Sequence, residues 1–147
     1  MKRIRHALAG ALAVFGLGLA GTAGAVVQGT LTKNIVDLNN PCTPGHDSID
    51  GVLNINYTLQ RGSDGVVTLS LSARGSGSDA NNLFYRFLAS GTFQFHDPLP
   101  AQIVLTVRLQ PSNTPTSNAT LGLFLQIDER GRVTDLGQSG LQCGSSV

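Results

Sequence analysis

Apolar and polar residues alternate along much of this chain, and this alternation constrains its fold more than any other feature. In residues 53–59 and 67–73 every odd-numbered residue is apolar or aromatic, and the residues between them are Asn, Ser or Thr. A period of two is typical of strands that have one face on a core and the other in water. Residues 62–65, Gly-Ser-Asp-Gly, separate the two runs, so we predict an antiparallel hairpin.

The same pattern predicts further strands, in residues 27–36, 83–89, 93–95, 103–109, 121–127 and 133–136. Residues 90–92, Ser-Gly-Thr, are expected to be the turn of a second hairpin, and residues 129–132 form another predicted turn. Proline cannot donate a hydrogen bond to a sheet, and glycine adopts turn conformations freely. On that basis we predict loops at residues 39–41, 75–79, 97–100 and 111–118.

These strands fix the expected fold class. No stretch after residue 25 repeats apolar residues at helical intervals, and about seven or eight strands lie at spacings suited to sequential pairing. We therefore predict a single all-β domain in residues 26–147, folded as an antiparallel β-barrel or a barrel-like β-sandwich. A meandering barrel is favoured because successive hairpins dominate and long crossover connections are scarce.

Residues 1–25 have the composition of an export signal. Lys2, Arg3 and Arg5 precede an apolar stretch, residues 7–20, that is too short and too rich in Gly and Ala to span a membrane stably. Residues 23–25, Ala-Gly-Ala, are small enough for signal peptidase. We expect a secreted or periplasmic protein with no membrane span, and the Ala- and Gly-rich composition suits a bacterial source.

Charge excludes two classes of partner. The leader holds three of the ten Lys and Arg residues, so residues 26–147 keep seven against all nine Asp and Glu residues, a formal charge of about −2. A nucleic-acid surface needs clustered Lys and Arg to neutralise phosphates, and a polybasic membrane patch needs the same. The small, dispersed charge therefore predicts neither of these partners.

The two cysteines, Cys42 and Cys143, stand near opposite ends of the predicted domain. An even pair in an exported chain predicts a disulfide. A metal site is the alternative, but two isolated cysteines lack the paired ligand spacing of zinc sites, and we expect no metal or cofactor.

Candidate catalytic groups are the two His-Asp dipeptides, His46-Asp47 and His96-Asp97, with Asp50 nearby. An imidazole beside a carboxylate can ligate a metal or move protons near neutral pH. Both dipeptides lie in predicted loops, whereas metal-dependent His-Asp hydrolases place such ligands on helices. Solvated loop residues are therefore the favoured interpretation, and we predict no catalytic site.

Aromatic residues gather in the predicted second hairpin. Phe84 there, and Phe124 in a later strand, are out of phase with the apolar positions around them. Such side chains suit either an apolar ligand surface or packing beneath a loop or a second sheet. The candidate ligand-binding residues are Phe84, Tyr85, Phe87, Phe93, Phe95 and Phe124.

The segment Asn-Pro-Cys-Thr-Pro-Gly at residues 40–45 is followed by alternating residues 49–55 and an Asp-Gly turn at residues 64–65. It resembles a group of small uncharacterised secreted bacterial all-β proteins that begin with an Asn-Pro-Cys-Thr-Gly-Glu-like motif and often end near a second Cys. Residues 44–47, Pro-Gly-His-Asp, replace the Gly-Glu of that motif, so the match is partial. The resemblance implies a disulfide-tied β domain and no transferable catalytic residue.

Three functions follow as hypotheses. The first is an exported non-catalytic β domain that binds an extracellular surface partner or has a structural role. The second is a β-barrel that carries a small apolar ligand, suggested by the Phe-rich segment. The third is a hydrolase or isomerase that uses the two His-Asp loops, which requires His46 and His96 to lie close together.

Overall fold

The computed structural model describes residues 26–42, 48–113 and 119–144. These residues form eight strands and no helix, so none of them belongs to a helix that could cross a membrane. The predicted all-β class is confirmed. The strands are β1 (Val26–Asn39), β2 (Ser48–Arg61), β3 (Val66–Asp79), β4 (Phe84–His96), β5 (Ala101–Pro111), β6 (Ala119–Ile127), β7 (Val133–Gln138) and β8 (Gln142–Cys143).

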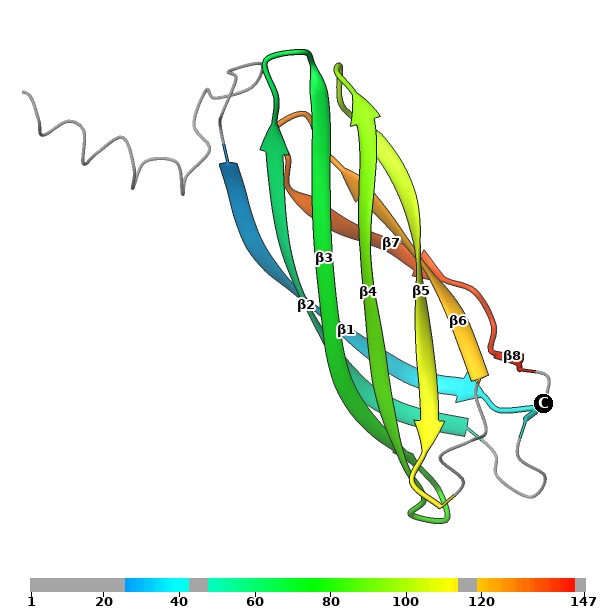
Figure 1. Cartoon of the computed structure of the whole chain (residues 1–147). Helices are drawn as coiled ribbons and strands as arrows, with labels where there is room; N and C mark the ends of the chain where they lie inside the picture. The colour runs from blue at the N-terminus through cyan, green and yellow to red at the C-terminus, as the bar shows by residue number, and fades with distance from the viewer. Residues whose placement is uncertain (1–25, 43–47, 114–118, 145–147) are drawn as a thin grey trace, which may run out of the picture.

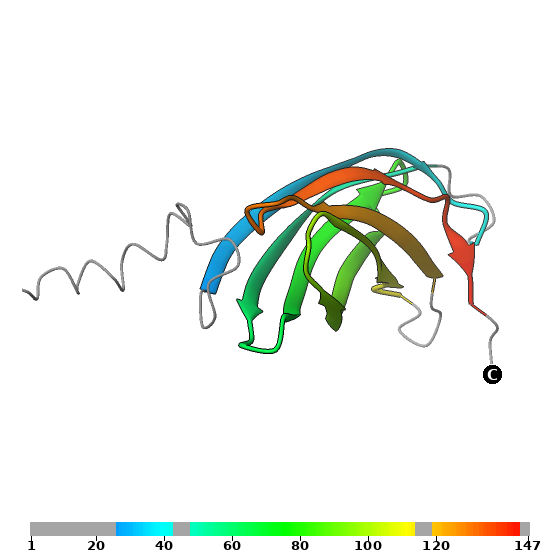
Figure 2. The same ribbon diagram turned by 90° about the horizontal axis from the view of Figure 1, so that it is seen from above.

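The strands form one antiparallel sheet in which β1 to β7 follow one another in sequence order, and the short β8 pairs with β6. The sheet coils strongly, so that β7 returns to lie beside β1 (Figures 1 and 2). The Lys33 ammonium of β1 donates a 2.7 Å hydrogen bond to Asp135 of β7 across this seam. The result is a nearly closed, barrel-like sheet, as predicted.

The core lies on the concave side of the sheet. It is filled mainly by Leu, Ile and Val side chains from alternate positions of β1 to β7, with Phe87 the largest fully buried side chain. The predicted hairpin of residues 53–59 and 67–73 is confirmed, because β2 and β3 pair from Ile49↔Asp79 to Arg61↔Val67. Its turn needs a glycine at Gly65, whose φ of 83° disfavours other residues.

Two predicted connections are wrong. Residues 75–79 are not a loop but the last part of β3, paired with both β2 and β4. The glycines serve close approach instead: a Cβ on Gly77 would lie 2.5 Å from the Asp50 carbonyl oxygen, and one on Gly51 2.7 Å from a Phe87 ring carbon. Glycine inside a strand often marks such an approach.

Residues 90–92 are not a turn either. β4 runs without interruption from Phe84 to His96, and Gly91 pairs with Leu71 of β3. The odd-numbered residues keep the same phase on both sides of Gly91, as one continuous strand requires. The β3–β4 turn lies earlier, where the Asp79 carboxylate accepts hydrogen bonds from the Asn81 and Leu83 amides at 2.9 and 3.0 Å.

The predicted turn at residues 129–132 is confirmed and is organised by Asp128. Its carboxylate accepts hydrogen bonds from the Arg130 and Arg132 amides, each 2.9 Å, and from Arg132 Nε at 3.0 Å. Burial raises the pKa of Asp128, but these hydrogen bonds and the Arg132 charge outweigh that effect, so its pKa lies below the ordinary value.

The disulfide links Cys42, just after β1, to Cys143 in β8, 101 positions apart in sequence. The two Cα atoms are 5.2 Å apart. The predicted bridge is therefore present, and it ties the C-terminal segment to the end of the sheet where β1 ends and β2 begins (Figure 1).

Candidate functional site

The six candidate aromatic residues do not form one surface. Phe87 is fully buried and Tyr85 is 4% exposed, while Phe93 and Phe95 are half-buried and pack against the core. Only Phe84 and Phe124 are on the outer face, 64% and 40% exposed.

Phe84 and Phe124 are also far from each other. Ser112 donates a backbone hydrogen bond to the Phe84 carbonyl, whereas Phe124 pairs with Val104, eight positions back along the same segment. At the rise of a β-strand, that spacing separates the positions of Phe84 and Phe124 by about 27 Å along the strand. The expectation of a shared aromatic ligand surface therefore has no geometric basis among these side chains.

The His-Asp candidates are likewise not assembled by the described residues. His46 and Asp47 lie outside the described ranges. Asp97 accepts hydrogen bonds from the buried guanidinium of Arg61, 3.2 Å from both Nε and Nη2, and Asp50 accepts one from the Asp37 amide at 2.7 Å. In the described part of the chain no group of three or more His, Cys, Asp or Glu side chains could hold a metal ion.

A different cluster lies on the outer face of β3, β4 and β5. Arg74 of β3 and Arg108 of β5 are both directly opposite Leu88 of β4, one on each side. Arg86 lies two residues from Leu88 on the same face of β4. Strand spacing and rise place the Cα atoms of Arg74 and Arg108 about 10 Å apart, and that of Arg86 about 7 Å from Leu88. We call these three arginines the arginine patch.

The arginine patch is exposed, and no acidic side chain in the described ranges forms an ion pair with it. The ion pairs between described residues join Lys33 to Asp135, Arg61 to Asp97 and Arg132 to Asp128. None of the three patch arginines takes part in an ion pair or a side-chain hydrogen bond within the described ranges. Three positive charges therefore share one small area, free to meet an anion from solution.

The surface around the patch is hollowed. A groove of about 380 Å³ is lined by Arg74 and Arg108 with Leu88 between them, and by the hydroxyl side chains Ser72, Ser90 and Thr106. A second hollow of about 340 Å³ is lined by Arg86 and the exposed Phe84. The guanidinium groups thus lie beside both apolar contact surface and neutral hydrogen-bonding groups.

Two rows of neutral polar side chains border the patch. The register aligns each row across β1, β2, β3 and β4, so that a row crosses four neighbouring strands. The first row, next to the patch, is Thr30, Asn56, Ser72 and Ser90, and the second is Gln28, Thr58, Ser70 and Thr92. We call them the polar rows. They contain no charged residue, and no side-chain hydrogen bond among the described residues occupies them.

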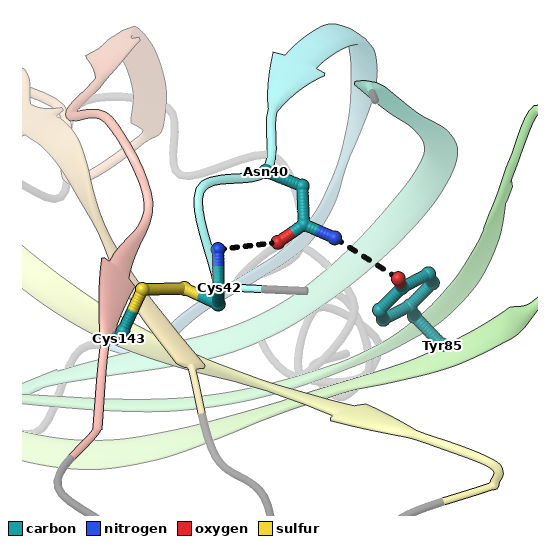
Figure 3. Close-up of a disulfide and its surroundings, with 4 residues drawn as sticks. All are labelled: Asn40, Cys42, Tyr85 and Cys143. Atoms are coloured by element: carbon teal, nitrogen blue, oxygen red, sulfur yellow. Dashed lines mark hydrogen bonds between the residues drawn. A yellow bond between two sulfur atoms is a disulfide. The ribbon is translucent and has the colours of Figure 1, made fainter. Parts of the chain in front are cut away.

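A buried network holds the start of β4, which carries Phe84 and Arg86. The Tyr85 hydroxyl donates to Asp79 Oδ2 at 3.0 Å and accepts from Asn40 Nδ2 at 3.0 Å. Asn40 Oδ1 in turn accepts a hydrogen bond from the amide of Cys42, the disulfide residue (Figure 3). The network therefore links the bridged end of the sheet to the strand that presents part of the arginine patch.

The arginine patch was not predicted from the sequence. The positive charge looks dispersed there, because Arg74, Arg86 and Arg108 are at least twelve positions apart in the chain. The available signal was their phase: all three are at even-numbered positions in segments whose odd-numbered residues face the core. Phase alone puts them on one face, but only the register of β3, β4 and β5 makes them neighbours.

No family model, curated protein or solved structure matches this chain.

Proposed function

We propose that this protein is an exported, non-catalytic binding module that holds an anionic ligand on the arginine patch. The observation that carries the proposal is the grouping around Leu88 of three exposed guanidinium groups that have no ion-pair partner in the part of the chain that the structure describes. Arginine presents a planar fork of donors that binds carboxylate, sulfate or phosphate groups through two parallel hydrogen bonds. The three positive charges repel one another, and a bound anion relieves this repulsion, so its binding is favourable.

The compartment is supported by the disulfide. Cys42 and Cys143 are paired, and disulfides persist in oxidising compartments such as the periplasm and the extracellular space. Together with the leader composition of residues 1–25, this supports a secreted or periplasmic site of action. We also retain the absence of catalysis as part of the proposal, since the ligand would meet side chains that bind charge and not reactive groups.

The apolar-carrier alternative has weaker support. It was suggested by the Phe-rich segment, and the aromatic residues that suggested it divide between the core and two separate outer positions. The apolar side chains at the patch, the exposed Phe84 and the half-buried Leu88, fit better as contact surface beside the charged groups.

Two carboxylate polymers, polyglutamate and polygalacturonate, test the proposal. Calorimetry with the disulfide-intact protein should show binding of at least one polymer, and this binding should weaken as salt is added. The triple variant Arg74→Gln, Arg86→Gln and Arg108→Gln should weaken it by more than about a hundredfold, because each charge-assisted contact is worth about tenfold and at least two of the three arginines would contact the polymer.

Arg130→Gln is the control for the loss of an arginine charge outside the patch: it removes one positive charge from the β6–β7 turn, whereas the patch variant removes three. It should change the dissociation constant by less than about twofold, which corresponds to less than about 0.5 kcal/mol of binding free energy. Binding of neither polymer, or equal losses in the patch variant and the Arg130 variant, would overturn the proposed function.

A further inference from the structure

We infer that the anionic ligand is an acidic polysaccharide that lies across the strands, with its carboxylates on the arginine patch and its sugar hydroxyls on the polar rows. This inference rests on the proposed function and adds the chemical class of the ligand. Its basis is the neutral hydrogen-bonding surface that continues directly from the patch.

The first polar row is continuous with the groove at the arginine patch. Ser72 and Ser90 belong to the first polar row and also line the groove beside Arg74, Leu88 and Arg108. A polymer whose charged group enters that groove therefore meets the polar row without leaving the surface. The next row of the register, Thr32, Asn54, Arg74, Leu88 and Arg108, crosses five strands and runs parallel to it.

The polar rows carry groups that suit sugar hydroxyls. Their eight side chains are hydroxyls and amides, which can each donate and accept hydrogen bonds. Sugar hydroxyls also donate and accept, so they pair with such groups, whereas a carboxylate only accepts. A surface built for charge alone would carry more cations in these positions, and the rows carry none.

The spacing and the number of the row residues suit a polymer of linked sugars. Successive members of a row are one strand apart, about 4.8 Å, which is close to the length of one sugar unit. Each exposed contact is individually weak, but a chain of linked sugars makes several at once and gains affinity by linkage. A short anion would use the arginines and leave the rows unoccupied. The exposed ring of Phe84 and the side chain of Leu88 offer apolar surface to the C–H face of a sugar.

Other polyanions fit less well. A nucleic acid requires more phosphate contacts than three arginines supply, in a domain with a formal charge of about −2. A peptide made only of Asp and Glu would use the arginines but has no side-chain hydroxyl groups for the polar rows. It is therefore the comparison that the test includes.

The experiment compares three polymers on the disulfide-intact protein. Polygalacturonate carries one carboxylate and free hydroxyls on each sugar, its methyl ester keeps the hydroxyls without the charge, and polyglutamate keeps the charge without the hydroxyls. We expect polygalacturonate to bind at least about tenfold more tightly than either of the others. Calorimetry resolves a tenfold difference in dissociation constant.

The variant Asn56→Ala, Ser72→Ala and Ser90→Ala removes most of the first polar row and leaves every arginine in place. It should weaken polygalacturonate binding by about tenfold and change polyglutamate binding by less than about twofold. Ser72→Ala alone, at an exposed position, provides a second measurement if the triple variant folds poorly, and thermal melting checks the fold of both.

The outcomes separate the two proposals. Equal affinity for polygalacturonate and polyglutamate, with no effect of the row variant, would refute the polysaccharide inference and leave the proposed anion-binding function intact. Stronger binding of the methyl ester would refute the charge requirement. Binding of neither acidic polymer would overturn both proposals together.

Discussion

Replacement of Phe87 by alanine tests whether one ring holds β2, β3 and β4 together where their glycines lie. Phe87 is 0% exposed and projects from β4 onto the region where β2 and β3 contain glycine. Its ring atoms Cε2 and Cζ lie 2.7 Å from the positions that a Cβ would take on Gly51 and Gly77. The ring therefore covers two stretches of backbone that have no side chains of their own.

The expected cost follows from that geometry. Truncation of a buried Phe to Ala destabilises proteins by about 3–5 kcal/mol, and the loss is larger where neighbours cannot move into the space. Gly51 and Gly77 have no side chains to fill the cavity, so we expect a loss in the upper half of this range. Total stabilities are about 5–15 kcal/mol, so the variant would lose a large share of its stability.

Denaturant unfolding of the disulfide-intact protein measures this loss. Phe87→Ala should lower the midpoint strongly with an unchanged slope, which indicates altered stability and not altered compactness. Phe124→Ala is the control, because the same truncation at a ring that is 40% exposed should cost only about 1 kcal/mol. If the two variants lost similar amounts, the role assigned to Phe87 would be refuted.

Two further predictions concern covalent and acid stability. Replacement of Cys42 and Cys143 by alanine opens a loop of 101 residues, which should cost up to about 4.7 kcal/mol and lower the melting temperature; unchanged melting would refute a stabilising bridge. The lowered pKa of Asp128 contributes stability that is present above its unfolded pKa of about 3.9 and is lost as pH falls through the folded value. Asp128→Asn should therefore flatten the pH dependence of unfolding below pH 4, and an unaltered profile would contradict this assignment.

Much of the fold was predictable from local pattern. The period of two along residues 53–59 and 67–73 identified two strands, and Gly65 identified the turn between them. A disulfide was predictable from the cysteine count and from the composition of residues 1–25, which is typical of an export signal, without any knowledge of the distance between Cys42 and Cys143. In each case the information needed lies within a few residues or in a simple count.

The errors arose where one residue type serves two purposes. Glycine and serine in residues 75–79 and 90–92 suggested turns, because those residues are common in turns. In the structure Gly75 and Gly77 lie in β3, where β2 and the ring of Phe87 approach too closely for a side chain. That requirement comes from other strands and cannot be read from the local segment.

The arginine patch shows the same limit, and the proposed function depends on β4 for the same reason. Arg74 and Arg108 become neighbours only because β4 pairs with β3 on one side and β5 on the other, and β4 pairs with β5 over just four positions, Tyr85↔Pro111 to Leu88↔Arg108. The buried hydrogen bonds of Tyr85 fix β4 at one end of this short ladder. Loosening that end would shift Arg108 relative to Leu88, so the proposed binding surface depends on a hydroxyl group that no ligand would touch.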